Sequence, residues 1–144
     1  MYSTLKGLPS FEEMDKYFEI SSIEDECTFP VREVRRKVIE IVSLYSKIVE
    51  ELLHPDSGSA MHEVSQFTDK EKEGHLSLYK KLKKIERMGL HVALTFDEAQ
   101  QAAYVSEVFA SWKGIIVGLQ GISSKLASAW DHEVSTKKDN GYFG

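Results

Sequence analysis

Apolar residues recur in alternating steps of four and three between Val34 and Leu52, and this spacing places them along one face of an α-helix. The seam consists of Val34, Val38, Ile41, Tyr45, Ile48 and Leu52. Pro30 suits the first helical position, because the N–H that proline lacks would have no helical partner there. The residue before a proline is pushed out of helical geometry, so this helix is expected to end near His54. So long an amphipathic helix needs other helices to cover its apolar face.

The same spacing resumes after the turn PDSGS and predicts a second long helix, with Ser59 as its N-cap. Thr68 and Glu71 have the spacing of a capping box, so the helix is expected to break or kink there. Gly89 is the expected C-terminal stop, because glycine readily adopts the left-handed conformation that ends many helices. The seam consists of Ala60, Val64, Phe67, Glu71, His75, Leu78, Leu82 and Ile85.

The third helical pattern is the longest and runs from Phe96 to His132, with Thr95 and Glu98 predicted to cap its start. Its apolar face carries Tyr104, Val108, Trp112, Ile115, Leu119, Ile122, Leu126 and Ala129. The glycines at positions 114, 118 and 121 each weaken a helix by roughly 1 kcal/mol relative to alanine. Because the apolar phase passes through them without a slip, we expect one long helix rather than two.

Before these three patterns lies one short helical candidate, SFEEMDKYF, which Ser10 and Glu13 can close with a capping box. Phe11, Met14 and Phe18 recur at helical spacing and should dock this helix on the rest of the chain. We therefore predict an all-α fold: an antiparallel helical bundle of three long helices plus a short N-terminal helix, with the last helix long and central.

The length and composition fit one soluble domain. A chain of 144 residues can enclose a single core, so we expect one domain over residues 1–144, with residues 1–9 and 135–144 as frayed ends. The net charge of -5 argues against nonspecific binding to nucleic acid or to anionic membranes. Cys27 is the single cysteine, which fits a reducing compartment. The most apolar segment, GIIVGLQGI, is too short to span a bilayer, and we expect a cytoplasmic protein.

Glu71 and His75 form the candidate polar pocket, since they lie four residues apart on the apolar seam of the second helix. A carboxylate and an imidazole on a buried face could form a proton-transfer pair or half of a metal site. The alternative, which is favoured, is that Glu71 only caps the helix at Thr68 and that His75 packs at the edge of the bundle. We assign no catalytic residue, no cofactor and no metal.

Two other polar clusters have plainer explanations. In HPDSGSAMHE, Glu51 and His54 match the Glu-x-x-His spacing of di-iron bundles, but they fall near the polar side of their helix and no second such motif exists. That stretch is interpreted as a helix connector. The lysine cluster lies opposite the apolar seam, which is typical of a solvated face rather than of a nucleic-acid site. Its members are Lys80, Lys81, Lys83, Lys84 and Arg87.

Small, uncharged residues occupy the reverse side of the longest helix, where charged residues would be usual. Such a stripe lets another helix approach closely. We therefore expect a non-enzymatic homo-oligomer that acts through protein–protein contacts, with no nucleic acid and no membrane as partner. The alternative is a ligand- or metal-binding bundle, with or without enzymatic activity, whose pocket lies around Glu71 and His75. The interface residues are expected to be Ala103, Ala110, Gly114, Gly118 and Gly121.

Overall fold

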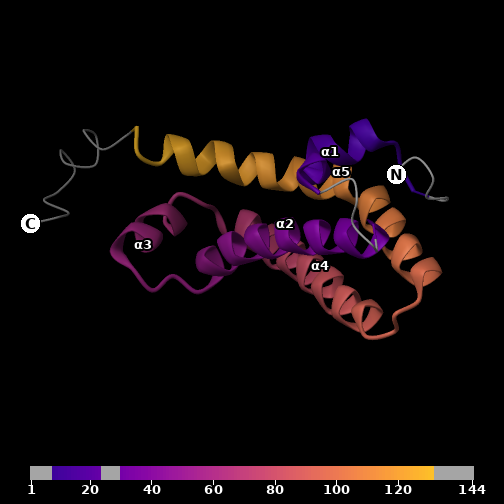
Figure 1. Ribbon diagram of the computed structural model, residues 1–144. Helices are drawn as coiled ribbons and strands as arrows, with labels where there is room; N and C mark the ends of the chain where they lie inside the picture. Colours follow the sequence, from indigo (N-terminus) through magenta and orange to yellow (C-terminus); the bar gives the residue numbers. More distant parts are fainter. Residues whose placement is uncertain (1–7, 24–29, 132–144) are drawn as a thin grey trace, which may run out of the picture.

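A computed structural model describes residues 8–23 and 30–131, and every regular element within them is helical (Figure 1). The all-α prediction is therefore confirmed, with a short N-terminal helix and three long helices. Cys27 and nearly all of the ends predicted to fray lie outside the described residues. The elements are α1 (Phe11–Phe18), the 3-10 turn η2 (Ile20–Ser22), α2 (Pro30–Leu53), α3 (Gly58–Val64), α4 (Asp69–Ala93) and α5 (Glu98–Ser128).

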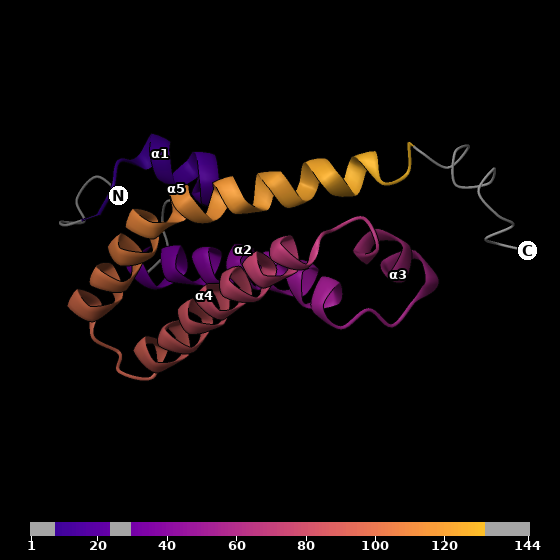
Figure 2. The ribbon, with the colours of Figure 1, turned by 180° about the vertical axis from the view of Figure 1, so that it is seen from behind.

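The three long helices pack together with alternating directions, and Figures 1 and 2 show them from opposite sides. α5 is one continuous helix of 31 residues, as predicted. It bends beside α1, where Phe18 packs on Trp112 with 5.1 Å between ring centroids. The Ser111 hydroxyl donates to the Val108 carbonyl oxygen at 3.0 Å, a type of bond that often bends helices. The bend lets α5 cross the end of the bundle and then run along its length.

The core follows the predicted seams closely, with one drift along α2. Val38, Val42 and Val49 are fully buried, whereas the predicted Ile48 is 37% exposed. An ideal helix drifts by about 20° per heptad against a strict seven-residue repeat. The buried face of α2 therefore shifts gradually along the helix, and Val49 rather than Ile48 lies in the core.

One buried polar contact joins α2 to α5. The Arg35 guanidinium donates from Nε to the side-chain oxygen of Gln101 at 3.1 Å, and both residues are buried. Burial, followed by the charge of Arg36, lowers the pKa of Arg35. Pairing of this kind is needed because a buried polar group without a partner is costly.

Two helix starts differ from the sequence-based expectation. Ser57 rather than Ser59 caps α3, by accepting the Ala60 N–H. Asp97 rather than Thr95 caps α5, by accepting the Gln100 N–H. In both cases the hydroxyl or carboxyl oxygen that reaches the third backbone amide is the one that caps. The predicted break at Thr68 is confirmed, because the complete capping box with Glu71 starts α4 there.

The prediction that Gly89 ends its helix is wrong. α4 continues through Gly89 to Ala93, and Gly89 is buried. A Cβ on this residue would lie 2.6 Å from Cδ1 of Ile39 and 2.7 Å from the Tyr104 hydroxyl oxygen. That hydroxyl donates to the Ile85 carbonyl oxygen at 2.8 Å, and burial raises the pKa of Tyr104. Because Gly89 has no side chain, Ile39 of α2 and Tyr104 of α5 can pack closely against α4.

Candidate functional site

Glu71 and His75 both line a hollow of about 280 Å³ between α4 and α5. Phe67, Leu78 and Ile122 form its apolar walls, together with Val117. Gly74, Gly118 and Gly121 also line it, and the lack of side chains at these positions keeps it open. The structure therefore brings the two predicted residues to the same place, but they serve different purposes there.

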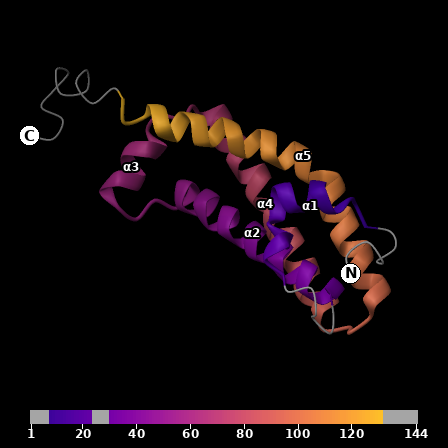
Figure 3. The same ribbon diagram turned by 45° about the horizontal axis from the view of Figure 1, so that its top comes forward.

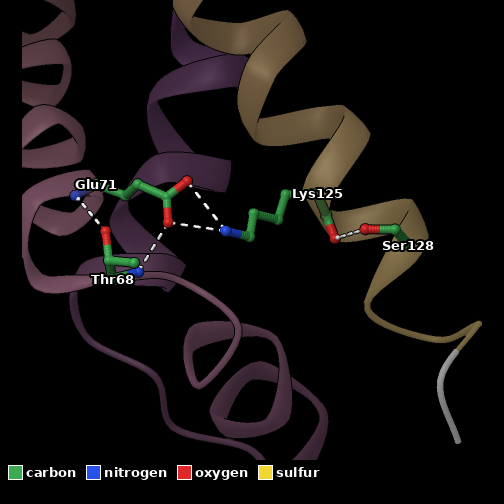
Figure 4. A network of polar contacts seen from close by, with 4 residues as sticks. All are labelled: Thr68, Glu71, Lys125 and Ser128. Atoms are coloured by element: carbon green, nitrogen blue, oxygen red, sulfur yellow. Dashed lines mark hydrogen bonds and ion pairs between the residues drawn. The ribbon is translucent and has the colours of Figure 1, made fainter.

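Glu71 is held by three contacts, which Figure 4 shows from close by. Its carboxylate accepts the Thr68 N–H at 2.8 Å, which completes the capping box. The Lys125 ammonium group of α5 donates to both carboxylate oxygens, at 2.8 and 3.1 Å. The hydrogen bond from Lys125, followed by the one from Thr68, lowers the pKa of Glu71 to about 2. Glu71 therefore caps the start of α4 and forms an ion pair with Lys125 of α5.

Lys125 is the residue of this site that the sequence did not reveal. Its ammonium group also lies 5.6 Å from the centre of the Phe67 ring, within reach of a cation–π contact. The available signal was its phase, since Lys125 follows Ile122 by three residues on the apolar face of α5. The carboxylate that Lys125 contacts, Glu71, lies at the start of the facing helix α4.

His75 is buried, with only 5% of its surface exposed. It meets the Phe67 ring edge-on at 4.5 Å between centroids. Burial lowers the pKa of His75, so the ring is neutral at pH 7. No hydrogen bond joins it to another described residue, Glu71 included. Within residues 8–23 and 30–131 no three metal-ligating side chains cluster together.

Residues of the connector HPDSGSAMHE contact the residues that follow α5. Figure 3 shows α3 close to the end of α5. A ring nitrogen of His62 lies 2.9 Å from the Ala129 carbonyl oxygen, and its ring packs on Trp130 at 4.5 Å. The Trp130 indole N–H donates to Glu63 at 3.0 Å. His54 and Asp56 are both exposed in the turn and join neither contact. The interpretation of this stretch as a helix connector agrees with these contacts.

The small-residue stripe of α5 faces outward. All five of its predicted interface residues, Ala103, Ala110, Gly114, Gly118 and Gly121, are exposed. A Cβ on Gly114 or Gly121 would meet no atom within 4 Å, and one on Gly118 would touch only Leu78, at 3.5 Å. Val117, which lies among them, is 68% exposed. No described segment of the chain covers this stripe, because α1 packs elsewhere on α5, through Phe109.

Two further hollows lie between α4 and α5. A second hollow of about 350 Å³ lies between Ile85 and Gly114, with Lys81 and Lys84 at its edge. A third, of about 220 Å³, lies between Met88 and Glu107 and shares Lys84 with the second. Both hollows are mainly apolar, and lysine side chains of α4 border them.

α5 is also long and apolar enough, by length and composition, to cross a membrane. The sequence-based expectation considered only the segment 114–122, whereas the whole helix passes this test. Only 33% of its most apolar 18-residue window is buried. The core helix of a soluble protein passes the same test, and α5 is tied to the bundle by Gln101 and Lys125. These polar ties favour a bundle helix that has one uncovered face.

Comparisons with protein-family models, with curated proteins and with solved structures gave no match to this chain. The function must therefore be argued from the bundle and its surfaces.

Proposed function

We propose that this protein is a non-enzymatic helical bundle that acts through protein–protein contacts, and that it first associates with a second copy of itself. The contact surface is the stripe of Ala103, Ala110, Gly114, Gly118 and Gly121 on α5. The observation that supports this proposal most is that the stripe is uncharged, exposed and uncovered by any described part of the chain.

Two physical arguments favour a helical partner on this stripe. Each glycine costs an exposed helix roughly 1 kcal/mol relative to alanine, so several in one row are unfavourable unless they allow close packing. A row without side chains also lets a second backbone approach nearer than ordinary helix contacts permit. Val117 supplies the largest exposed apolar side chain on this part of the helix, and a partner would remove it from water.

The proposal is tested by measuring molar mass by light scattering at several protein concentrations. The wild type should form a dimer or higher oligomer, and Gly114→Leu and Gly121→Leu should shift it toward monomer because leucine forces the backbones apart. Gly58→Leu is the matched control, since Gly58 is likewise exposed with nothing within 4 Å of an added Cβ but lies on α3. A monomeric wild type at every concentration would defeat the proposal, as would an oligomer indifferent to both α5 variants.

A ligand-binding role is the second candidate, and one observation favours it: the hollow of about 280 Å³ is lined by the imidazole of His75, which forms no hydrogen bond with another described residue. Small-molecule sites are commonly apolar hollows with a few polar groups. Divalent metals and a panel of small molecules should then raise the melting temperature of the wild type more than that of His75→Ala. Equal responses of the two proteins to every compound would remove this candidate.

A further inference from the structure

Three large apolar side chains protrude at the corner of the molecule where α4 ends and α5 begins. Leu90 is 55% exposed, Leu94 is 68% exposed and Phe96 is 70% exposed. Figures 1 and 2 both show this corner at the opposite end of the bundle from α3. Single exposed apolar residues are ordinary, but three within seven positions at one tip form a patch.

The backbone at this corner holds Phe96 in an unusual conformation. Phe96 has φ 57°, which places it in the left-handed region although it is not a glycine. Such a conformation is unfavourable for a bulky residue and tends to persist where the surroundings or a function require it. The Arg32 guanidinium lies 5.5 Å from the centre of the Phe96 ring, so a cation accompanies the exposed aromatic ring.

Unpaired cations approach the same corner along the outer side of α4. Lys80, Lys81, Lys84 and Arg87 are exposed, and none of them forms an ion pair with a described residue. Lys80, Arg87 and Leu94 follow one another at intervals of seven, which places them on one face of the helix. The cationic row and the apolar tip are therefore one continuous surface.

We propose that this surface docks onto an anionic lipid surface, with Leu90, Leu94 and Phe96 entering the boundary between headgroups and acyl chains. Lys80, Lys84 and Arg87 would then face the anionic headgroups. Apolar side chains bordered by Lys and Arg are the combination by which helices bind membrane interfaces. The overall charge of -5 is no obstacle, because the field falls off within a Debye length and local charge decides. Lys84 also borders the hollow that Gly114 lines, so this surface adjoins the α5 stripe, but the proposal does not depend on self-association.

An acidic surface of another kind fits less well. Nucleic acid would use the cations, but three protruding aliphatic and aromatic side chains would then stay in water unless they stacked on bases. Tyr79, the aromatic residue next to the cations, is engaged as a donor to Glu50. A lipid surface makes use of both the cations and the apolar side chains, whereas nucleic acid makes use of the cations.

The test is co-sedimentation of the full chain with vesicles of phosphatidylcholine alone and of equimolar phosphatidylcholine and phosphatidylserine. The wild type should bind the anionic vesicles, and the binding should weaken with added salt. Reversing Lys80, Lys84 and Arg87 to glutamate should lower the affinity by about fivefold or more per cation. The double variant Leu94→Ser/Phe96→Ser should lower it roughly tenfold or more, because the inserting groups are lost.

Matched controls separate this surface from charge or exposure in general. Met61→Ser removes a side chain of 58% exposure, close to the 55% of Leu90, from α3. Lys47→Glu, Lys70→Glu and Lys113→Glu together remove three exposed cations elsewhere. Both controls should bind like the wild type, and circular dichroism should show all variants folded.

Several outcomes would overturn the proposal. These are a wild type that does not bind anionic vesicles, equal binding to neutral vesicles, or control variants that lose as much affinity as the corner variants. Binding of labelled RNA or DNA but not of vesicles, sensitive to the α4 charge reversals, would overturn it in favour of a nucleic-acid surface.

Discussion

Gly89→Ala is a change of one methyl group that the structure predicts to be harmful in the middle of a helix. Alanine normally stabilises a helix interior by up to about 1 kcal/mol relative to glycine. At Gly89, however, the new Cβ would lie 2.6 Å from Cδ1 of Ile39 and 2.7 Å from the Tyr104 hydroxyl oxygen. Contacts this short force at least one of these buried groups to move.

The size of the effect follows from what has to move. The end of the Ile39 side chain can rotate, but Tyr104 is 3% exposed and its hydroxyl is bonded to the Ile85 carbonyl oxygen at 2.8 Å. Overpacking of a core costs roughly 1–3 kcal/mol, and a buried hydrogen bond broken at one partner costs a similar amount. After the gain in helix propensity, we expect a net loss of about 2 kcal/mol.

Urea unfolding followed by circular dichroism measures this loss as a lower midpoint at unchanged slope. Gly74→Ala is the control in the same helix, since a Cβ there meets nothing within 4 Å, and it should raise the midpoint slightly. In a Tyr104→Phe background, Gly89→Ala should cost less, because the hydroxyl that the Cβ strikes is gone. A Gly89→Ala protein as stable as Gly74→Ala would refute the close contact between α2, α4 and α5.

Two further predictions concern polar contacts between helices. Because the pKa of Glu71 is lowered from 4.5 to about 2, its stabilisation is present above pH 4.5 and is lost as the pH falls toward 2. The stability gap between wild type and Glu71→Gln should therefore shrink over that range, and a gap independent of pH would contradict the pairing with Lys125. Gln101→Leu should destabilise by about 2 kcal/mol, because it leaves the buried Arg35 without its partner. The double variant with Arg35→Met should recover most of that loss, and a single Gln101→Leu variant that unfolds like the wild type would argue against the buried pair.

Local sequence signals predicted the helices well. Thr68 and Glu71 identified the start of α4 because a capping box depends only on residues three apart. The absence of a phase slip identified α5 as one helix, although three glycines interrupt it. The predicted caps Ser59 and Thr95 each lie two positions away from the observed cap, and both the predicted and the observed residues are types that can cap a helix. Such errors are expected, because each short loop offers several suitable oxygens.

Features that depend on tertiary contact could not be predicted in this way. Gly89 resembles a helix stop in sequence, and only the approach of Ile39 and Tyr104 shows why a glycine is needed there. The candidate site was predicted in part, because Glu71 and His75 do line the same hollow. Lys125, which was not predicted, lies 54 positions after Glu71 in the sequence and belongs to α5. The way the helices cross decides whether Glu71 meets His75 or Lys125. The periodicity of the sequence does not encode that crossing.

Cysteine cross-linking along the α5 stripe measures whether two copies of the protein associate through this helix. In a Cys27→Ser background, single cysteines replace Ala103, Ala110, Gly114 or Gly121 in turn, and dimer formation under mild oxidation is followed by non-reducing electrophoresis. A disulfide needs Cα atoms within roughly 7 Å, so only positions near the symmetry axis of the dimer can react quickly. If the dimer forms through α5, at least one stripe position should cross-link much faster than a cysteine at the exposed Glu51 of α2. No stripe position reacting faster than that control would contradict a dimer built through α5.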